Sequence, residues 1–273
     1  MTPKLRYHRR GVHGELSPCG RTLTIPMPVR ETKSNELVEL LNRLAEQPSE
    51  FQLAKAKREA KALVSKDANE GYTLLGIIAA LEQNAGEMHR NHRLAIQNAP
   101  NNWWGQENYA KSLFRLGYFS EASDLASRLA DRDPTHLDIL RTAIGASTRA
   151  GKLERAIDLY ARAGKLNYED GAVRNDMEAV FSVVDFLRSA GITEAVLEKA
   201  VSIAASVAHE SDAILDDVRL QVLSDDSPFV SLMLLVKRPA AVTPLSVSLV
   251  DRMMEEMADF PADQVSVGFL SVS

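Results

Sequence analysis

Apolar residues recur at helical spacing along most of this chain, and between residues 69 and 168 the pattern is periodic. Pro100 and Pro134 lie 34 residues apart, and so do Gly117 and Gly151. Between these breaks, small residues stand three or four positions from larger apolar ones, as in amphipathic helices that pack in pairs. The period therefore predicts a stack of helical pairs, in which each pair buries its apolar face against its neighbours.

Three successive units, which begin at Asn69, Trp103 and Leu137, carry residues of one known signature. The tetratricopeptide repeat has a W-x2-L-G-x2-Y…A-x3-F…P pattern in each helix–turn–helix unit. The matching residues are Tyr72, Leu75, Gly76, Ala79, Met88, His92, Ala95 and Pro100 in the first unit, Gln106, Tyr109, Ala110, Leu113, Ala122, Ala126, Leu129 and Pro134 in the second, and Leu140, Ala143, Ile144, Ser147, Ala156, Tyr160 and Ala163 in the third. Residues 69–168 thus resemble this family, although Tyr168 replaces the last proline.

The resemblance implies a concave surface that binds another polypeptide, lined by the second, fifth, ninth and twelfth positions of each unit. These positions predict a groove lined by Glu70, Thr73, Ile77, Trp104, Glu107, Lys111, Phe114, Asp138, Arg141 and Thr148. Trp104 would anchor an amphipathic helix or an extended segment; alternatively, Trp104 packs between units, as Trp103 could. The lining lacks the lysine and asparagine clamp by which some relatives hold a C-terminal carboxylate, since only Asn108 matches it.

Further helices flank the three units and extend the predicted helical repeat domain over residues 34–211. Two precede the repeats, separated at Pro48, and two come after them, separated at Gly191. The first would begin at Ser34 or Asn35, because such side chains cap helix N-termini. Its apolar stripe consists of Leu37, Val38, Leu40, Leu41 and Leu44. We expect the first pair to cap the stack and the last pair to close it.

The pattern changes to that of strands near residue 217. Val218, Leu220 and Val222 alternate with polar residues, and 229–236 is almost continuously apolar, as in a more deeply buried strand. Thr243 and Pro244 predict the start of a helix. Its inward residues would be Leu245, Leu249, Val250, Met253, Met254 and Met257, and a last strand would come after it over 264–272.

The predicted fold class is therefore mainly α, a solenoid similar to tetratricopeptide repeats followed by a small α+β module with ββαβ order at residues 217–273. A free-standing domain of that size has marginal stability because it buries little surface. We expect the module to pack on the last helices or on another copy of itself.

The first residues differ in composition from the rest and predict a flexible arm over residues 1–33. Residues 1–30 hold six Lys or Arg against the single acid Glu15, and four prolines that favour extended backbone. A basic arm attracts nucleic-acid phosphates without sequence specificity. The alternative is a solvated leader, or one that lies across the acidic remainder of the chain, and no folded nucleic-acid-binding motif accompanies the arm.

Composition and segment lengths favour a cytoplasmic location. The hydrophobic share of 45% and charged share of 25% are those of an ordinary globular protein. No apolar run approaches the roughly 20 residues that span a bilayer, and no apolar segment comes after the basic N-terminus as in a secretory signal. The one cysteine, Cys19, cannot form an internal disulfide.

Candidate catalytic and metal-binding residues are few. His89 and His92 lie three apart on one predicted helix and could share a metal, but no cysteine or nearby carboxylate completes a site, and His92 occupies a core position of its repeat. Cys19 has no fixed base beside it. Glycine-rich phosphate-binding motifs and the G-x-S-x-G motif are absent from the sequence. The sequence thus predicts a protein that is not an enzyme and needs no cofactor or metal.

Two classes of function remain open, with a third alternative. The first is a non-catalytic scaffold, adaptor or chaperone that holds a partner peptide or helix in the concave groove, with possible self-association through the C-terminal module. The second is an effector or enzyme whose activity lies in that module, to which the repeats recruit a substrate. The third is a nucleic-acid-associated regulator that uses the basic arm.

Overall fold

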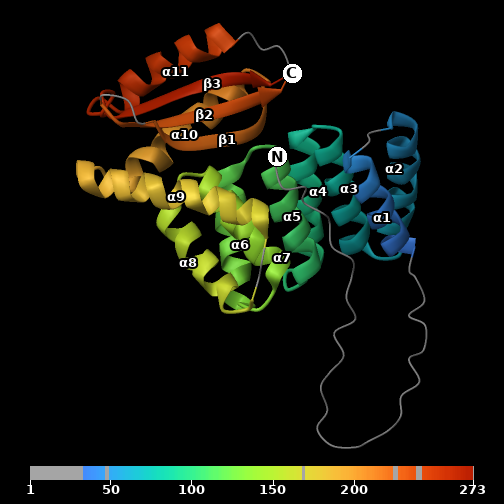
Figure 1. Ribbon diagram of the computed structural model, residues 1–273. Coiled ribbons are helices and arrows are strands. Elements are labelled where there is room, and N and C mark those ends of the chain that lie inside the picture. The colour runs from blue at the N-terminus through green and yellow to red at the C-terminus, as the bar shows by residue number, and fades with distance from the viewer. Residues whose placement is uncertain (1–32, 47–48, 168–169, 224–226, 238–241, 273) are drawn as a thin grey trace, which may run out of the picture. The chain divides into compact units, whose positions relative to one another are not determined.

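The computed structural model describes residues 33–46, 49–167, 170–223, 227–237 and 242–272 (Figure 1). The predicted arm over residues 1–33, with Cys19, His8 and His13, lies outside them but for Lys33. The chain divides into two compact units, and the boundary falls after Tyr109, inside a helix.

The unit before this boundary is entirely helical in its described residues. It contains α1 (Lys33–Glu46), α2 (Glu50–Val64), α3 (Ala68–Leu81), α4 (Ala85–Asn98) and the first half of α5 (Trp103–Arg115). Three of these helices begin at side-chain caps, in which Ser49, Asp67 and Asn84 accept a hydrogen bond from the amide three residues later. Such caps satisfy a helical N–H that has no backbone partner, which explains where these helices start.

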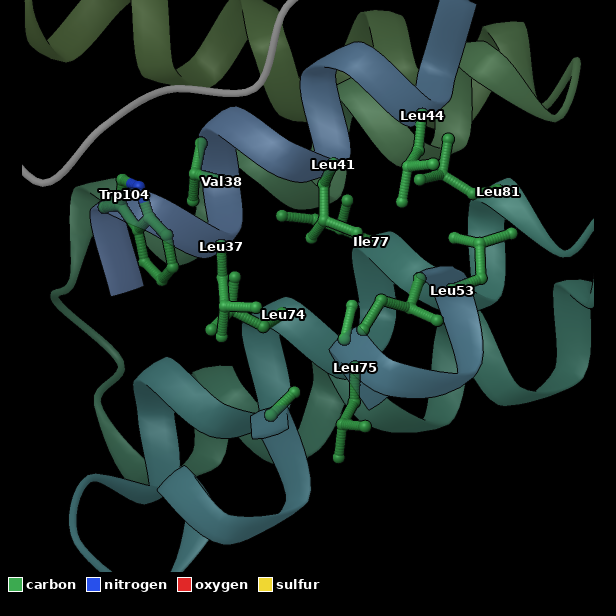
Figure 2. Packing of buried hydrophobic residues seen from close by; sticks show 13 residues of the cluster. Leu37, Val38, Leu41, Leu44, Leu53, Leu74, Leu75, Ile77, Leu81 and Trp104 are labelled. Atoms are coloured by element: carbon green, nitrogen blue, oxygen red, sulfur yellow. The ribbon is translucent and has the colours of Figure 1, made fainter. Parts of the chain in front are cut away.

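The core of this unit gathers apolar side chains from four helices, some of which Figure 2 shows. Helix α1 contributes the stripe that the sequence predicts, and Leu37, Val38, Leu41 and Leu44 are all buried. They join side chains of α2, α3 and α5 in one cluster. Helix α1 is therefore held by its apolar face.

The second unit begins with stacked helices. It contains the rest of α5, then α6 (Phe119–Arg132), α7 (Leu137–Arg149), α8 (Leu153–Gly164), α9 (Gly171–Ala190) and α10 (Glu194–Glu210). Helices α4, α6 and α8 begin at residues 85, 119 and 153, so the 34-residue period of the sequence is present in the structure. The prediction of stacked helical pairs is confirmed.

The turns inside the three repeated pairs use the same backbone conformation. Gly117 and Gly151 have φ angles of 80° and 75°, as expected for glycines that end a first helix. In the first pair, the equivalent residue is Gln83, with a φ of 59°. A side chain in this left-handed region is strained, so the first turn keeps the conformation without the residue that favours it.

Helices α9 and α10 are separated at Gly191, as predicted, and they support the C-terminal sheet. Helix α9 packs against α8, and both α9 and α10 contact the first strand of that sheet. Helix α10 also passes the turns of the preceding pairs. The backbone of Leu197 and Glu198 lies against Gly151, and the His209 ring stacks on Tyr118 with centroids 4.1 Å apart.

A three-stranded sheet and one helix complete the chain, which confirms the ββαβ order. Strand β1 (Ile214–Leu223) pairs antiparallel with β2 (Phe229–Lys237), and β2 pairs parallel with β3 (Val265–Val272) after the crossover helix α11 (Val242–Glu256). The strand order is β1-β2-β3. The alternate β2 residues and the inner face of α11 are buried, namely Val230, Leu232, Leu234, Val236, Leu249 and Met253.

The sequence interpretation of α11 was wrong about two residues. Val250 and Met254 were expected to point inward, but their side chains are 56% and 66% exposed. The buried stripe is narrower and consists of Leu245, Leu249 and Met253. The helix carries apolar residues on two sides, and only packing against its neighbours decides which side is buried.

Candidate protein-binding site

In the compact unit that ends at Tyr109, most side chains at the predicted groove positions are buried. The buried ones include Glu70, Thr73, Ile77 and Glu107. The Thr73 hydroxyl donates a hydrogen bond of 2.8 Å to the carbonyl of Asn69. A Cβ placed on Gly105 would lie 3.3 Å from Thr73 Oγ1. Helix α5 therefore approaches α3 closely on this side.

Trp104 packs in one apolar cluster with helix α1. The indole ring is 6% exposed and belongs to the same cluster as Leu37, Val38 and Leu41 of α1, together with Leu74 and Ile77 of α3 (Figure 2). In this conformation Trp104 is a packing residue, which is the alternative that the sequence left open. The apolar lining of this unit thus receives the apolar face of an amphipathic helix, and that helix belongs to the chain itself.

Asparagines tie the first pair to the start of α5. Asn102 donates from Nδ2 to Asn69 Oδ1 at 2.6 Å, and Asn69 donates to the Ala95 carbonyl at 2.8 Å. Asn108, the one residue that matched the carboxylate clamp, is buried and donates to the Trp104 carbonyl at 2.8 Å. Its amide is used inside the fold.

The two histidines of α4 pack against Tyr109. The His92 ring is fully buried and stacks on Tyr109 at a centroid distance of 4.9 Å, while His89 Nδ1 lies 2.8 Å from the Tyr109 hydroxyl. Burial, with a smaller contribution from His89, lowers the pKa of His92 to about 3. A Cβ on Gly76 would fall 2.6 Å from the imidazole. His92 is therefore a neutral core residue.

The groove positions of the second unit divide into buried and accessible ones. Lys111 and Phe114 are buried, and the Phe114 ring meets Phe119 edge-on with centroids 5.6 Å apart. Asp138 is exposed, and Arg141 is half-buried. Asp138 and Arg141 are thus the predicted lining residues that a partner could reach in this unit.

Arg141 is held in place by an acidic residue that caps a helix. Its Nε lies 3.1 Å from Asp170 Oδ2. The other oxygen of Asp170 accepts hydrogen bonds from the amides of Ala172 and Val173, at the start of α9. The ion pair therefore presents a positioned guanidinium beside the exposed carboxylate of Asp138.

A buried arginine that the sequence patterns did not single out joins the helices to the sheet. The Arg149 side chain, at the end of α7, is only 3% exposed. Its Nε donates to Asp217 of β1 at 2.5 Å, and its Nη1 donates to Asp176 of α9 and to the Gly145 carbonyl, both at 3.3 Å. The guanidinium also lies over the Phe114 ring, 5.4 Å from its centroid. Arg149 thus occupies the junction between α7, α9 and β1.

Thr148 lies next to this junction. It is buried, and its hydroxyl has no hydrogen-bond partner among the described residues. A buried hydroxyl without a partner costs free energy, so Thr148 is an unsatisfied polar group within the predicted lining.

A separate hollow of about 320 Å³ lies where α9 turns into α10. Glu154, Arg188 and Glu194 are among its lining residues. The Glu194 carboxylate accepts a hydrogen bond of 2.8 Å from the Glu154 amide, so this carboxylate satisfies the N-terminal end of α8. None of the predicted groove residues lines this hollow.

No three His, Cys, Asp or Glu side chains among the described residues gather closely enough to hold a metal ion. No helix in the same ranges is long and apolar enough to cross a membrane. Compared with known proteins, the chain matches no protein-family model and no curated protein.

Proposed function

We propose that this protein is a non-catalytic, cytoplasmic scaffold or adaptor whose stacked helical pairs hold an amphipathic helix or extended segment of a partner protein. The tetratricopeptide-like pattern of the sequence supports this class of function. Repeat stacks present extended concave surfaces that bind other polypeptides, and an amphipathic helix commonly binds through its apolar face in such a groove.

The packing of α1 on α3 and α5 is the main observation that supports the proposal. Leu74, Ile77 and Trp104 form an apolar lining that already accepts the Leu37, Val38 and Leu41 side of α1. This surface therefore has the chemistry needed to hold a helix. An occupant from a partner would use the same kind of contact.

The accessible charged residues of the second unit support a polar component of recognition. Asp138 is exposed beside Arg141, whose guanidinium is positioned by Asp170. Charged side chains at the margin of an interface select partners and orient them. We expect these two charged positions to contribute to the selection of the partner.

The test uses the full chain and one matched control. Proteins that co-purify with the chain are identified by mass spectrometry, and the partner is then purified and titrated against wild type, Asp138→Arg and Glu121→Arg. Both substituted acids are exposed and lie in the first turn of their helices. Asp138→Arg should weaken binding about tenfold, as expected for one interfacial charge contact, and Glu121→Arg should not.

Two results would reject the proposal. One is that no protein binds the purified chain with a measurable Kd. The other is that the two charge reversals change the Kd equally, because the bound partner would then lie away from the predicted groove.

A further inference from the structure

The outer face of α11 carries an apolar stripe that no described residue covers. Val247, Val250 and Met254 are all more than half exposed, and Thr243 continues the row toward the start of the helix. With the half-buried Met257 these residues are spaced by four, three, four and three positions. This alternation is the heptad spacing by which one helix packs lengthwise on another.

The stripe points away from the neighbouring helix α10. Arg252 lies on the side of α11 that faces α10, since its guanidinium nitrogens donate to the carboxylate of Glu210, the last residue of α10, at 2.8 and 3.3 Å. Successive helical residues are rotated by about 100°. Val250 and Met254, each two residues from Arg252, therefore lie on the opposite side of the helix.

The open edge of the sheet lies on that same side. Helix α11 packs on β3, and β3 is the end strand of the sheet in the described residues; Figure 1 shows α11 along β3, at the far side of the sheet from β1. Because α10 flanks α11 on one side, the stripe faces outward where β3 ends the sheet. The apolar stripe and the unpaired strand edge form one continuous surface.

Strand β3 lacks the features that keep a strand edge from pairing. Its eight residues contain no charge and no proline, and Leu270 is 42% exposed. Edge strands of monomeric proteins usually carry a lysine, a proline or a bulge that blocks pairing with another chain. An edge without them is suited to accept another strand.

We propose that a second copy of this chain docks on this surface, with β3 paired antiparallel to β3 of the other copy and the two α11 stripes in contact. A strand edge can pair with itself about a two-fold axis, so one surface supplies both halves of the interface. Helix α11 packs on β3, so pairing of the two β3 edges would bring the two α11 helices side by side.

The size of the surface suits a dimer of moderate affinity. Eight residues of strand span about 27 Å. With one sheet layer and one helix layer, the two copies would bury on the order of 1,000 Å² together, which is at the lower limit for specific interfaces. We therefore expect association in the micromolar range rather than an obligate dimer.

The charges near the stripe predict a salt dependence. Asp251 and Glu255 are exposed beside it on α11. A two-fold axis brings these acids toward their symmetry mates, and salt screens the repulsion between exposed like charges. Dimerisation should strengthen when the ionic strength rises from about 0.05 to about 0.5 M.

The test is sedimentation equilibrium of the full chain from about 1 to 200 µM, with three variants. Val250→Glu changes the stripe and Leu270→Lys changes the strand edge, while Phe51→Glu is the matched control at an exposed apolar residue of α2. Wild type and Phe51→Glu should dimerise alike, and both interface variants should weaken dimerisation at least tenfold. Circular dichroism checks that each variant is folded.

Hydrogen exchange distinguishes this interface from any other. Amides of β3 in the wild type should exchange more slowly as the concentration rises through the dimerisation range, because strand pairing protects them. A wild type that stays monomeric at 200 µM overturns the proposal, whether or not another protein binds there. So does a dimer that Val250→Glu and Leu270→Lys leave intact or whose β3 amides gain no protection.

Discussion

Helices α3 and α11 have similar lengths, but the structure uses their apolar residues differently. Helix α3 is buried at twelve of its fourteen residues, whereas α11 is buried at three of its fifteen. The first lies inside a stack and has neighbours around it. The second covers one side of a sheet and leaves Val247, Val250 and Met254 exposed.

The difference shows that the number of apolar residues in a helix does not fix how many it buries. A helix inside a repeat stack meets another element in nearly every direction, so even its polar residues, such as Thr73, become buried. A helix that packs on one side keeps a second surface free. Helix α3 therefore buries nearly all of its apolar surface, while α11 leaves an apolar stripe exposed.

The largest expected effect comes from the residue that links these two regions. Arg149→Ala should lower the free energy of unfolding by about 4 kcal/mol, because it leaves Asp217 and Asp176 at the junction without their cation. Chemical denaturation measures this loss. Arg128→Ala, at an exposed arginine of α6, is the control and should change stability by less than about 0.5 kcal/mol. Equal effects would mean that the buried ion pairs do not secure the junction.

The two sides of α11 offer a direct test of its asymmetry. Leu249→Ala should cost about 3 kcal/mol, because it removes a buried side chain from the module. Val250→Ala, one residue away, should change the unfolding free energy by less than about 0.5 kcal/mol at concentrations that keep the chain monomeric. Urea denaturation followed by circular dichroism compares them. Similar losses would show that the outer stripe is packed.

The turns of the helical pairs predict changes of opposite sign at one repeat position. Gly151→Ala should cost about 2 kcal/mol or more, because a Cβ there adopts a left-handed backbone and would meet the Leu197 carbonyl carbon at 2.9 Å. Gln83→Gly should instead stabilise the chain by about 0.5 kcal/mol through relief of strain at a φ of 59°. Thermal melts of both variants measure the signs. A loss in Gln83→Gly would indicate that its side-chain contacts outweigh the strain.

The buried histidine predicts a pH dependence of stability in the first unit. The pKa of His92 is lowered to about 3 in the folded chain from 6.5, so between these values the unfolded state binds the extra proton. The contribution of the neutral His92 to the free energy of unfolding is complete above pH 6.5. As the pH falls below 6, the free energy of unfolding should decrease by about 1 kcal/mol per pH unit. Denaturation series at pH 8, 6, 5 and 4 should show a smaller slope for His92→Phe. An unchanged slope would mean that His92 is not neutral in the fold.

Local patterns in the sequence were sufficient for the architecture. The helical spacing within each unit, the glycines of two turns and the alternation in the last strands each depend on residues within a few positions of one another, and the 34-residue period repeats such local patterns. A helical or extended segment is selected by such short-range preferences, and the structure bears these predictions out. The turn at Gln83 was harder to predict from the sequence, because a glutamine there adopts the left-handed backbone conformation that glycine usually adopts.

Contacts between distant residues decided what the surface of the molecule offers. Arg149 meets partners 27 and 68 residues away in the chain, and Trp104 packs in one cluster with side chains of α1. The sequence limited Trp104 to a groove or a packed interface, and it marked both sides of α11 as apolar. Which side is buried depends on the three-dimensional arrangement of elements that are far apart in sequence, and periodicity along a single helix contains no information about that arrangement.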